Sequence, residues 1–181
     1  MEPDVWNAWL FFVFYWLSMP LLMLRCPSIL GRLSAGPSAP KERVLRIAQW
    51  VLFLVAAVYS VFVPLQVGTT WFAVGLPIAL VGAAGFGLTV LSLPGWEAAS
   101  GPLRTGPYRF SRHPMYVTSI VMFLGVAIAC RSLPLFIYVV LMATLQVIAA
   151  RQEECQCLVT YGDDYAQYMR KTPRWLGPPR G

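Results

Sequence analysis

Charge is scarce in this 181-residue sequence: Asp, Glu, Lys and Arg make up 12 % of it, about half of the share in soluble domains. Hydrophobic residues make up 57 %, and many of them occur in long runs. A soluble protein of this length could not bury such runs, so the sequence predicts an integral membrane protein. The excess of 14 Lys and Arg over 8 Asp and Glu does not indicate nucleic-acid binding, because no soluble basic face carries it.

Metal ligands and nucleotide motifs are equally scarce. The single histidine, His113, excludes the multi-histidine di-iron site of membrane desaturases and a bis-histidine haem. The four cysteines lack the paired spacing of a zinc or redox site. A P-loop and a G-x-G-x-x-G motif are also missing. Chemistry should therefore depend on arginine, glutamate, tyrosine, one histidine and an organic cofactor, without a metal.

Apolar runs are abundant, and they predict an all-α integral membrane protein with about five transmembrane helices. The predicted spans are Val5–Leu24, Val44–Val67, Trp71–Leu93, Met115–Ala129 and Leu135–Ala150. The last two are short and are separated by a tight turn, which predicts a helical hairpin. In the third span small residues recur every four positions, a pattern that predicts close helix packing. These small residues are Gly75, Ala79, Ala83 and Gly87.

The chain is predicted to be a single structural domain with two regions. Residues 1–93 hold the three N-terminal spans, with a cytoplasmic loop at about 25–43, and residues 94–181 form the catalytic region with a cytoplasmic C-terminal cofactor-binding tail. Lys and Arg alternate between rich and poor loops along the chain. This alternation predicts an N-terminus outside and a C-terminus in the cytoplasm. The compact design without eukaryotic retention signals favours a prokaryotic inner membrane.

Two polar clusters flank the predicted hairpin. Residues 106–116, with Arg112 and His113, precede it, and Glu153 and Glu154 follow it. Ionisable residues at a bilayer boundary are costly unless they are paired or functional. Both clusters lie on the same side of the membrane in this topology, so we expect them to form one polar pocket.

The residue types of this pocket suit a zwitterionic, nucleoside-bearing cofactor. Arg112 offers a planar fork for a carboxylate or phosphate, and Glu153 and Glu154 accept hydrogen bonds from an ammonium or from ribose hydroxyls. Pro114 favours the first turn of the following helix, whose free amide groups attract an anion. Tyrosine rings offer flat faces for an adenine or a cation. These tyrosines are Tyr108, Tyr116, Tyr161, Tyr165 and Tyr168.

Two motifs connect these residues to a known family. Residues 105–116 read T-G-P-Y-x-x-S-R-H-P-x-Y, and residues 153–175 read E-E-x-x-x-L-x-x-Y-G-x-x-Y-x-x-Y-x-x-x-T-P-x-W. In this order and spacing, residues 94–177 resemble the isoprenylcysteine carboxyl methyltransferase and phospholipid methyltransferase superfamily. The resemblance implies that S-adenosylmethionine binds between the hairpin and the tail. The methyl acceptor would be lipophilic and would enter from the bilayer: an isoprenylcysteine-type carboxylate, a phospholipid amine or a small hydrophobic thiol.

The resemblance also implies roles for individual residues. Arg112 or Arg174 would position a carboxylate acceptor, and a glutamate or His113 would accept the proton of an amine or thiol. Thr118, where the family often has glycine, bears on the size of the acceptor. The implied catalytic residues are Arg112, Glu154 and Arg174. The implied cofactor-binding residues are Tyr108, Arg112, His113, Pro114, Tyr116, Glu153, Glu154 and Tyr165.

Two other functions remain open. The first is an NADPH-dependent membrane sterol or enone reductase, because such reductases share a similar R-H-P segment. They usually have an asparagine before the motif tyrosine and an R-D-E sequence in place of the glutamate pair, whereas this chain has Met115 and Gln152-Glu153-Glu154. The second is a non-catalytic membrane scaffold, which would bind no cofactor. We interpret Arg104 and Arg109 as topology determinants that meet membrane lipid phosphates.

Overall fold

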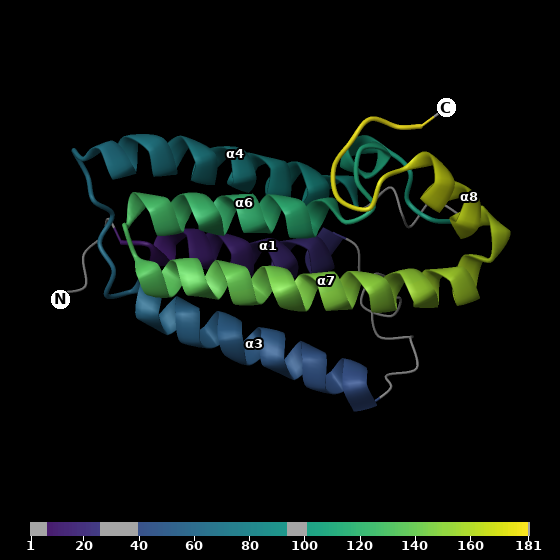
Figure 1. Cartoon of the computed structure of the whole chain (residues 1–181), viewed down its shortest axis with the longest axis horizontal. Coiled ribbons are helices and arrows are strands. Elements are labelled where there is room, and N and C mark those ends of the chain that lie inside the picture. The colour runs from purple at the N-terminus through teal and green to yellow at the C-terminus, as the bar shows by residue number, and fades with distance from the viewer. Residues whose placement is uncertain (1–6, 26–39, 94–100, 181) are drawn as a thin grey trace.

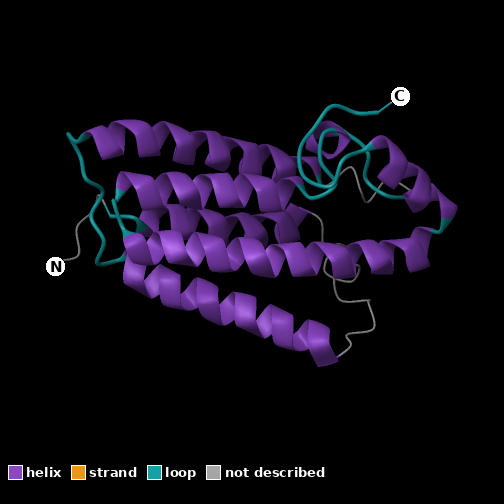
Figure 2. Cartoon of the chain, in the orientation of Figure 1, coloured by secondary structure: helices purple, strands orange, loops and turns teal. Residues whose placement is uncertain are grey.

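The computed structural model describes residues 7–25, 40–93 and 101–180, and within these residues it is helical, with no strand. Figures 1 and 2 show long helices packed along one common direction, with a short helix and the C-terminal tail at one end. The all-α class predicted from the sequence is thereby confirmed. The helices are α1 (Trp9–Arg25), α3 (Pro40–Ser60), α4 (Thr70–Ser92), α6 (Pro114–Ala129), α7 (Leu133–Tyr161) and α8 (Asp163–Lys171), with a 3₁₀ turn η1 (Gly106–Arg109).

Several of these helices suit a membrane. Among the described residues, three segments are long and apolar enough to cross a bilayer: Arg43–Ser60 in α3, all of α4, and α7. The apolar stretches Trp9–Ser18 and Pro114–Ala129 are shorter. Large hydrophobic side chains such as Val55 on α3 are exposed on the outside of the bundle, as expected for a lipid-facing surface. The bundle fits an integral membrane protein, and the number of spans stays a prediction.

Two predicted boundaries were wrong. The second span ends at Ser60 and not at Val67, because Pro64 has no N–H to donate and disfavours helix in the residue before it. The fifth span does not end at Ala150 but continues as helix to Tyr161. The prediction followed the apolar run, which ends at Ala150, whereas the helix continues into polar residues. The predicted third span, Trp71–Leu93, is confirmed as α4, which ends at Ser92 with Leu93 as its C-cap. The predicted loop near residues 25–43 lies largely outside the described residues.

The irregular segment after α3 is held by backbone hydrogen bonds. Ala8 N donates to Val63 O (3.0 Å), and Gln66 N donates to Ala129 O (3.1 Å). These bonds tie the segment to the start of α1 and to the end of α6, next to the predicted hairpin turn. Ser132 caps α7 there, because its hydroxyl accepts a hydrogen bond from Leu135 N. The predicted hairpin is thereby confirmed as α6 and α7.

Helices α4 and α6 approach so closely that their backbones touch. A Cβ atom at Gly75 would overlap the backbone of Ala129, one at Gly125 would overlap Ala79, and one at Gly82 would overlap Met122. The predicted small-residue face is therefore correct for Gly75 and Ala79 and wrong for Gly87, where a Cβ would meet open space. A strict spacing of four residues drifts around a helix with 3.6 residues per turn, so the packed face shifts to Gly82.

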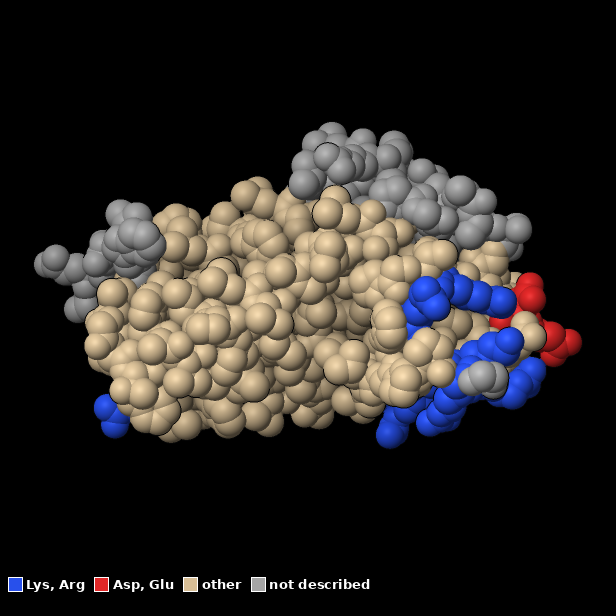
Figure 3. Space-filling model, turned by 90° about the horizontal axis from the view of Figure 1, so that it is seen from above, with Lys and Arg blue, Asp and Glu red and all other residues tan. Residues whose placement is uncertain are grey.

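Basic residues gather at one end of the bundle. Figure 3 shows Lys and Arg together with Asp and Glu at one end of the visible face, and a small basic patch at the other. Figure 1 places η1, α8, the C-terminal tail and the start of α3 at the same end. At the opposite end, where α4 begins and the hairpin turns, the guanidinium of Arg131 lies 5.6 Å from the centre of the Trp71 ring. The orientation of the chain in the membrane stays a prediction.

We expect Gly125→Ala to destabilise the protein by about 1–3 kcal/mol, because the added methyl group must push the α4 and α6 backbones apart. Gly87→Ala is the matched control, since it adds the same methyl group to open space on α4. Thermal unfolding of both variants in detergent measures the difference. Equal unfolding temperatures for the two variants would contradict the close packing of α4 and α6.

Candidate active site at the end of the helical hairpin

The C-terminal tail folds back along the segment before α6. Arg112 N donates a hydrogen bond to Pro173 O (3.0 Å), and Ser111 Oγ donates to Arg174 O (3.2 Å). The same Ser111 oxygen accepts a hydrogen bond from His113 N (3.0 Å). Residues 111–113 therefore fix the position of the tail, and the tail brings Arg174 towards the end of α7.

Glu154 lies at the centre of the cluster and is 3 % exposed. Its Oε2 accepts a hydrogen bond from Arg174 Nη2 (2.6 Å), and its Oε1 lies 3.1 Å from His113 Nε2 and 3.3 Å from Arg112 Nη1. Hydrogen bonding to this carboxylate raises the pKa of Arg174. A buried carboxylate is tolerated when such partners replace its lost hydration. Glu154 therefore joins α7, the segment before α6 and the tail.

Glu153 is the outer carboxylate of the pair, with a side chain that is 51 % exposed. Its Oε1 accepts a hydrogen bond from the Tyr116 hydroxyl, and its Oε2 lies 3.4 Å from His113 Nδ1. The His113 ring thus connects the two carboxylates through its two nitrogens. This ring also stacks on Tyr116, with centroids 5.5 Å apart, and lies 6.0 Å from the Trp175 ring.

Arg112 is the one member of the cluster whose hydrogen bonds are incomplete. Its side chain is 8 % exposed, and its Nε and Nη1 atoms are buried without a hydrogen-bond partner among the described residues. Nη1 is within ion-pair distance of Glu154 but does not make a hydrogen bond to it. A buried donor without an acceptor is unfavourable. The described residues therefore leave two donor atoms of this guanidinium without an acceptor.

Tyrosines surround the cluster on the side of α8. Tyr165 and Tyr168 are each 5 % exposed, and the Tyr168 hydroxyl donates to Tyr108 O (2.8 Å). Burial raises the pKa of both α8 tyrosines, so they remain neutral phenols. Tyr108 itself packs against the hydrophobic cluster that contains Phe86. These residues support the shape of the site, whereas Tyr116 and Trp175 lie directly against His113.

Most residues predicted from the sequence are therefore brought together. Arg112, His113 and Glu154 meet, Arg174 joins them from the tail, and Glu153 lies beside them. Further predicted members of the site are Tyr116, which contacts Glu153, Pro114, which is the first residue of α6, and Tyr108 and Tyr165, which lie farther out.

A buried polar pair deeper in the bundle was not predicted from the sequence. Gln146 on α7 is 1 % exposed, and its Nε2 donates to Ser119 Oγ (3.2 Å). Ser119 in turn donates to Tyr116 O (3.0 Å). Gln146 lies about two helical turns before Glu153, on the same side of α7. This spacing was the sequence signal from which Gln146 could have been placed on the side of α7 that carries the glutamate pair.

Metal ligands do not come together in the described part of the chain: no group of three His, Cys, Asp or Glu side chains there could hold a metal ion.

Comparison with protein-family profiles matches residues 66–164 to the phospholipid methyltransferase family. The match covers more than half of the chain and includes both the R-H-P segment and the glutamate pair. The chain belongs to the phospholipid methyltransferase family. Comparison with curated proteins gave no match. Membership in the phospholipid methyltransferase family confirms the resemblance predicted from the two motifs, and it supports methyl transfer rather than hydride transfer. Arg174, beyond the matched residues, is connected to them by its contacts with Glu154.

We expect Glu154→Gln to destabilise this phospholipid methyltransferase family member by about 3 kcal/mol, because the buried Arg112 guanidinium loses its counter-charge and the partly exposed Arg174 loses its partner. Glu153→Gln is the matched control on the neighbouring, half-exposed position, where the loss should stay below about 1 kcal/mol. Chemical denaturation in detergent compares the two. A Glu154→Gln variant as stable as Glu153→Gln would show that the buried carboxylate does not hold the three segments together.

Proposed function

We propose that the chain is an S-adenosylmethionine-dependent methyltransferase that acts on a lipophilic acceptor in the membrane. The observation that carries this proposal is the Arg112 guanidinium, whose Nε and Nη1 are buried without a hydrogen-bond partner among the described residues. It lies where the start of α6, the end of α7 and the tail meet.

The donor set fits the proposed cofactor. The free nitrogens of Arg112 suit a carboxylate, which a planar guanidinium binds through two parallel hydrogen bonds. The exposed oxygens of Glu153 suit an ammonium group or ribose hydroxyls. The rings of Tyr116 and Trp175 suit the flat adenine. Tyr108, Tyr165, Pro114 and His113 would hold these groups in place.

Methyl transfer from S-adenosylmethionine requires no covalent intermediate on the protein. A bound sulfonium supplies a methyl group that is already activated for displacement. The residues of the chain must therefore orient the two reactants and exclude water. For a carboxylate acceptor, Arg112 or Arg174 supplies the positive charge that positions it. For an amine or thiol acceptor, Glu153 is the better proton acceptor, because Glu154 is already paired with both arginines.

The location of the site sets how the reactants enter. The cluster joins the start of α6, the end of α7 and the tail, which Figure 1 places at the end of the bundle near α8. Figure 3 shows Lys and Arg gathered at this end, which the positive-inside rule assigns to the cytoplasm. A water-soluble cofactor then arrives from the cytoplasm, and the lipophilic acceptor arrives between helices from the bilayer. The N-terminus lies outside, the chain crosses the membrane about five times, and a prokaryotic inner membrane is the proposed location.

Purified full-length protein in detergent is expected to bind S-adenosylhomocysteine and not NADP in calorimetric titrations. Arg112→Ala should weaken the binding of S-adenosylhomocysteine by roughly tenfold to a hundredfold, because a pair of charge-assisted hydrogen bonds is lost. Arg151→Ala, an exposed arginine on α7, is the matched control and should bind as the wild type does.

Three outcomes of these titrations separate the candidate functions. Tight NADP binding without the adenosyl ligand would favour the reductase, and binding of neither ligand by folded protein would favour the scaffold. Adenosyl-ligand binding that Arg112→Ala does not weaken would contradict the proposed site. Incubation with a total membrane lipid extract and methyl-radiolabelled S-adenosylmethionine then identifies the acceptor.

A further inference from the structure

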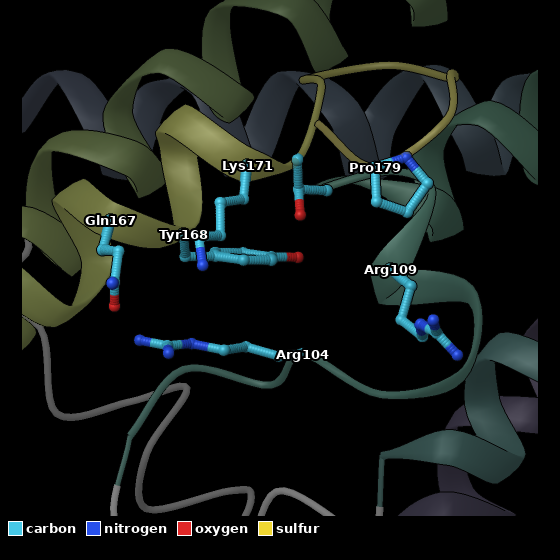
Figure 4. Close-up of a pocket in the computed structure, with 7 residues that line it drawn as sticks. Arg104, Arg109, Gln167, Tyr168, Lys171 and Pro179 are labelled. Atoms are coloured by element: carbon cyan, nitrogen blue, oxygen red, sulfur yellow. The ribbon is translucent and has the colours of Figure 1, made fainter. Parts of the chain in front are cut away.

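A second polar site lies between η1 and α8. It is a pocket of about 190 Å³, and none of Arg112, His113, Glu154 or Arg174 lines it. Figure 4 shows Arg104 extended beneath the Tyr168 ring and Gln167, with Arg109 on the opposite side of the pocket. The residues that line the pocket include Arg104, Arg109, Gln167, Tyr168, Lys171 and Thr172.

Positive charge dominates this pocket. Three of its lining side chains are cationic and none is acidic. Arg104 lies 3.8 Å from a carboxylate oxygen of Asp164, whose side chain is 71 % exposed. Such an exposed, long ion pair contributes little. Arg109 and Lys171 make no ion pair with any described residue. Arg104 Nη2 also donates a hydrogen bond to Asp164 O (2.7 Å), so it is Arg109 and Lys171 that lack compensating charge among the described residues.

The other lining residues offer neutral hydrogen-bonding groups. Thr172 contributes a hydroxyl and Gln167 an amide. The Tyr168 hydroxyl already donates to Tyr108 O, so it adds no donor for a ligand. A ligand with several acceptor oxygens would suit the unpaired cations Arg109 and Lys171, with the Thr172 hydroxyl and the Gln167 amide as further donors. A phosphate group has this character.

The position of the pocket adds to this chemistry. η1 follows α4 in the chain and precedes α6, two of the apolar helices, and it lies at the basic end of the bundle (Figure 1). Basic groups at such an end lie at the level of lipid headgroups. We propose that the pocket is a phosphate-binding site, separate from the cluster at Glu154. Its ligand is the phosphate of a phospholipid headgroup or of a soluble phosphate compound.

Calorimetric titration of the purified full-length protein in neutral detergent tests this site with three probes. Dihexanoyl phosphatidate carries the phosphate on a lipid, inorganic phosphate carries it free, and dihexanoyl phosphatidylcholine has a net-neutral headgroup. We expect phosphatidate to bind and phosphatidylcholine to bind roughly tenfold or more weakly. Inorganic phosphate of equal affinity would identify a soluble source, and a clear preference for phosphatidate would identify a lipid source. Both results support the phosphate site.

Matched variants separate the pocket from general surface charge. Lys171→Gln and Arg109→Gln should each weaken the binding of phosphatidate or inorganic phosphate, whichever the wild type binds, by roughly tenfold. Arg170→Gln and Arg151→Gln remove the same charge from exposed positions outside the pocket and should change binding by less than about twofold at physiological salt. All four side chains are exposed, so thermal unfolding should stay unchanged in each variant. Absence of probe binding by the folded wild type, or equal losses in pocket and control variants, would overturn the proposal.

Discussion

The pairing of one buried carboxylate with two guanidinium groups is the interaction on which the rest of the site depends. Glu154 belongs to α7, Arg112 precedes α6 and Arg174 lies in the tail, and no backbone hydrogen bond alone would keep all three in one place. Arg112 is buried and Arg174 only partly so, and the carboxylate between them offsets the repulsion of the two positive charges. The carboxylate thus compensates the arginines and joins the tail to the end of α7.

The helical framework makes this pairing possible. Helix α7 continues without a break from the apolar interior to Tyr161, so Glu153 and Glu154 are carried on a rigid element instead of a loop. The glycine contacts between α4 and α6 fix the position of α6 against α4. They thereby also fix the positions of Arg112 and His113, which directly precede α6. Packing deep in the bundle therefore sets the geometry of the charged residues at its end. A substitution at Gly125 should shift the positions of Arg112 and His113.

Sequence patterns predicted the parts of this arrangement that depend on local order. The apolar runs predicted helices and the hairpin, and the R-H-P and E-E motifs flanking it predicted that Arg112 and Glu154 would meet. The end of α3 at Ser60, ahead of Pro64, was not predicted, because the apolar run continues past the proline. The extension of α7 was missed because polar residues on a long helix give no apolar signal.

Contacts between distant segments were harder to predict. Arg104 and Arg109 were interpreted only as lipid contacts. The residues next to them in the sequence do not indicate that α8 places Lys171 in the same pocket. Likewise, the contact of Ser111 with Arg174 depends on how the tail turns after Thr172. Such placements are decided by tertiary packing, which outweighs local preference.

Hydrogen–deuterium exchange of the wild-type protein with and without S-adenosylhomocysteine tests the central claim most directly. If the cluster at Glu154 is the cofactor site, the ligand should slow exchange in residues 110–116, 151–158 and 172–177, the segments that this carboxylate joins. Saturating ligand that binds but leaves these segments unchanged, while protecting another part of the chain, would contradict the account.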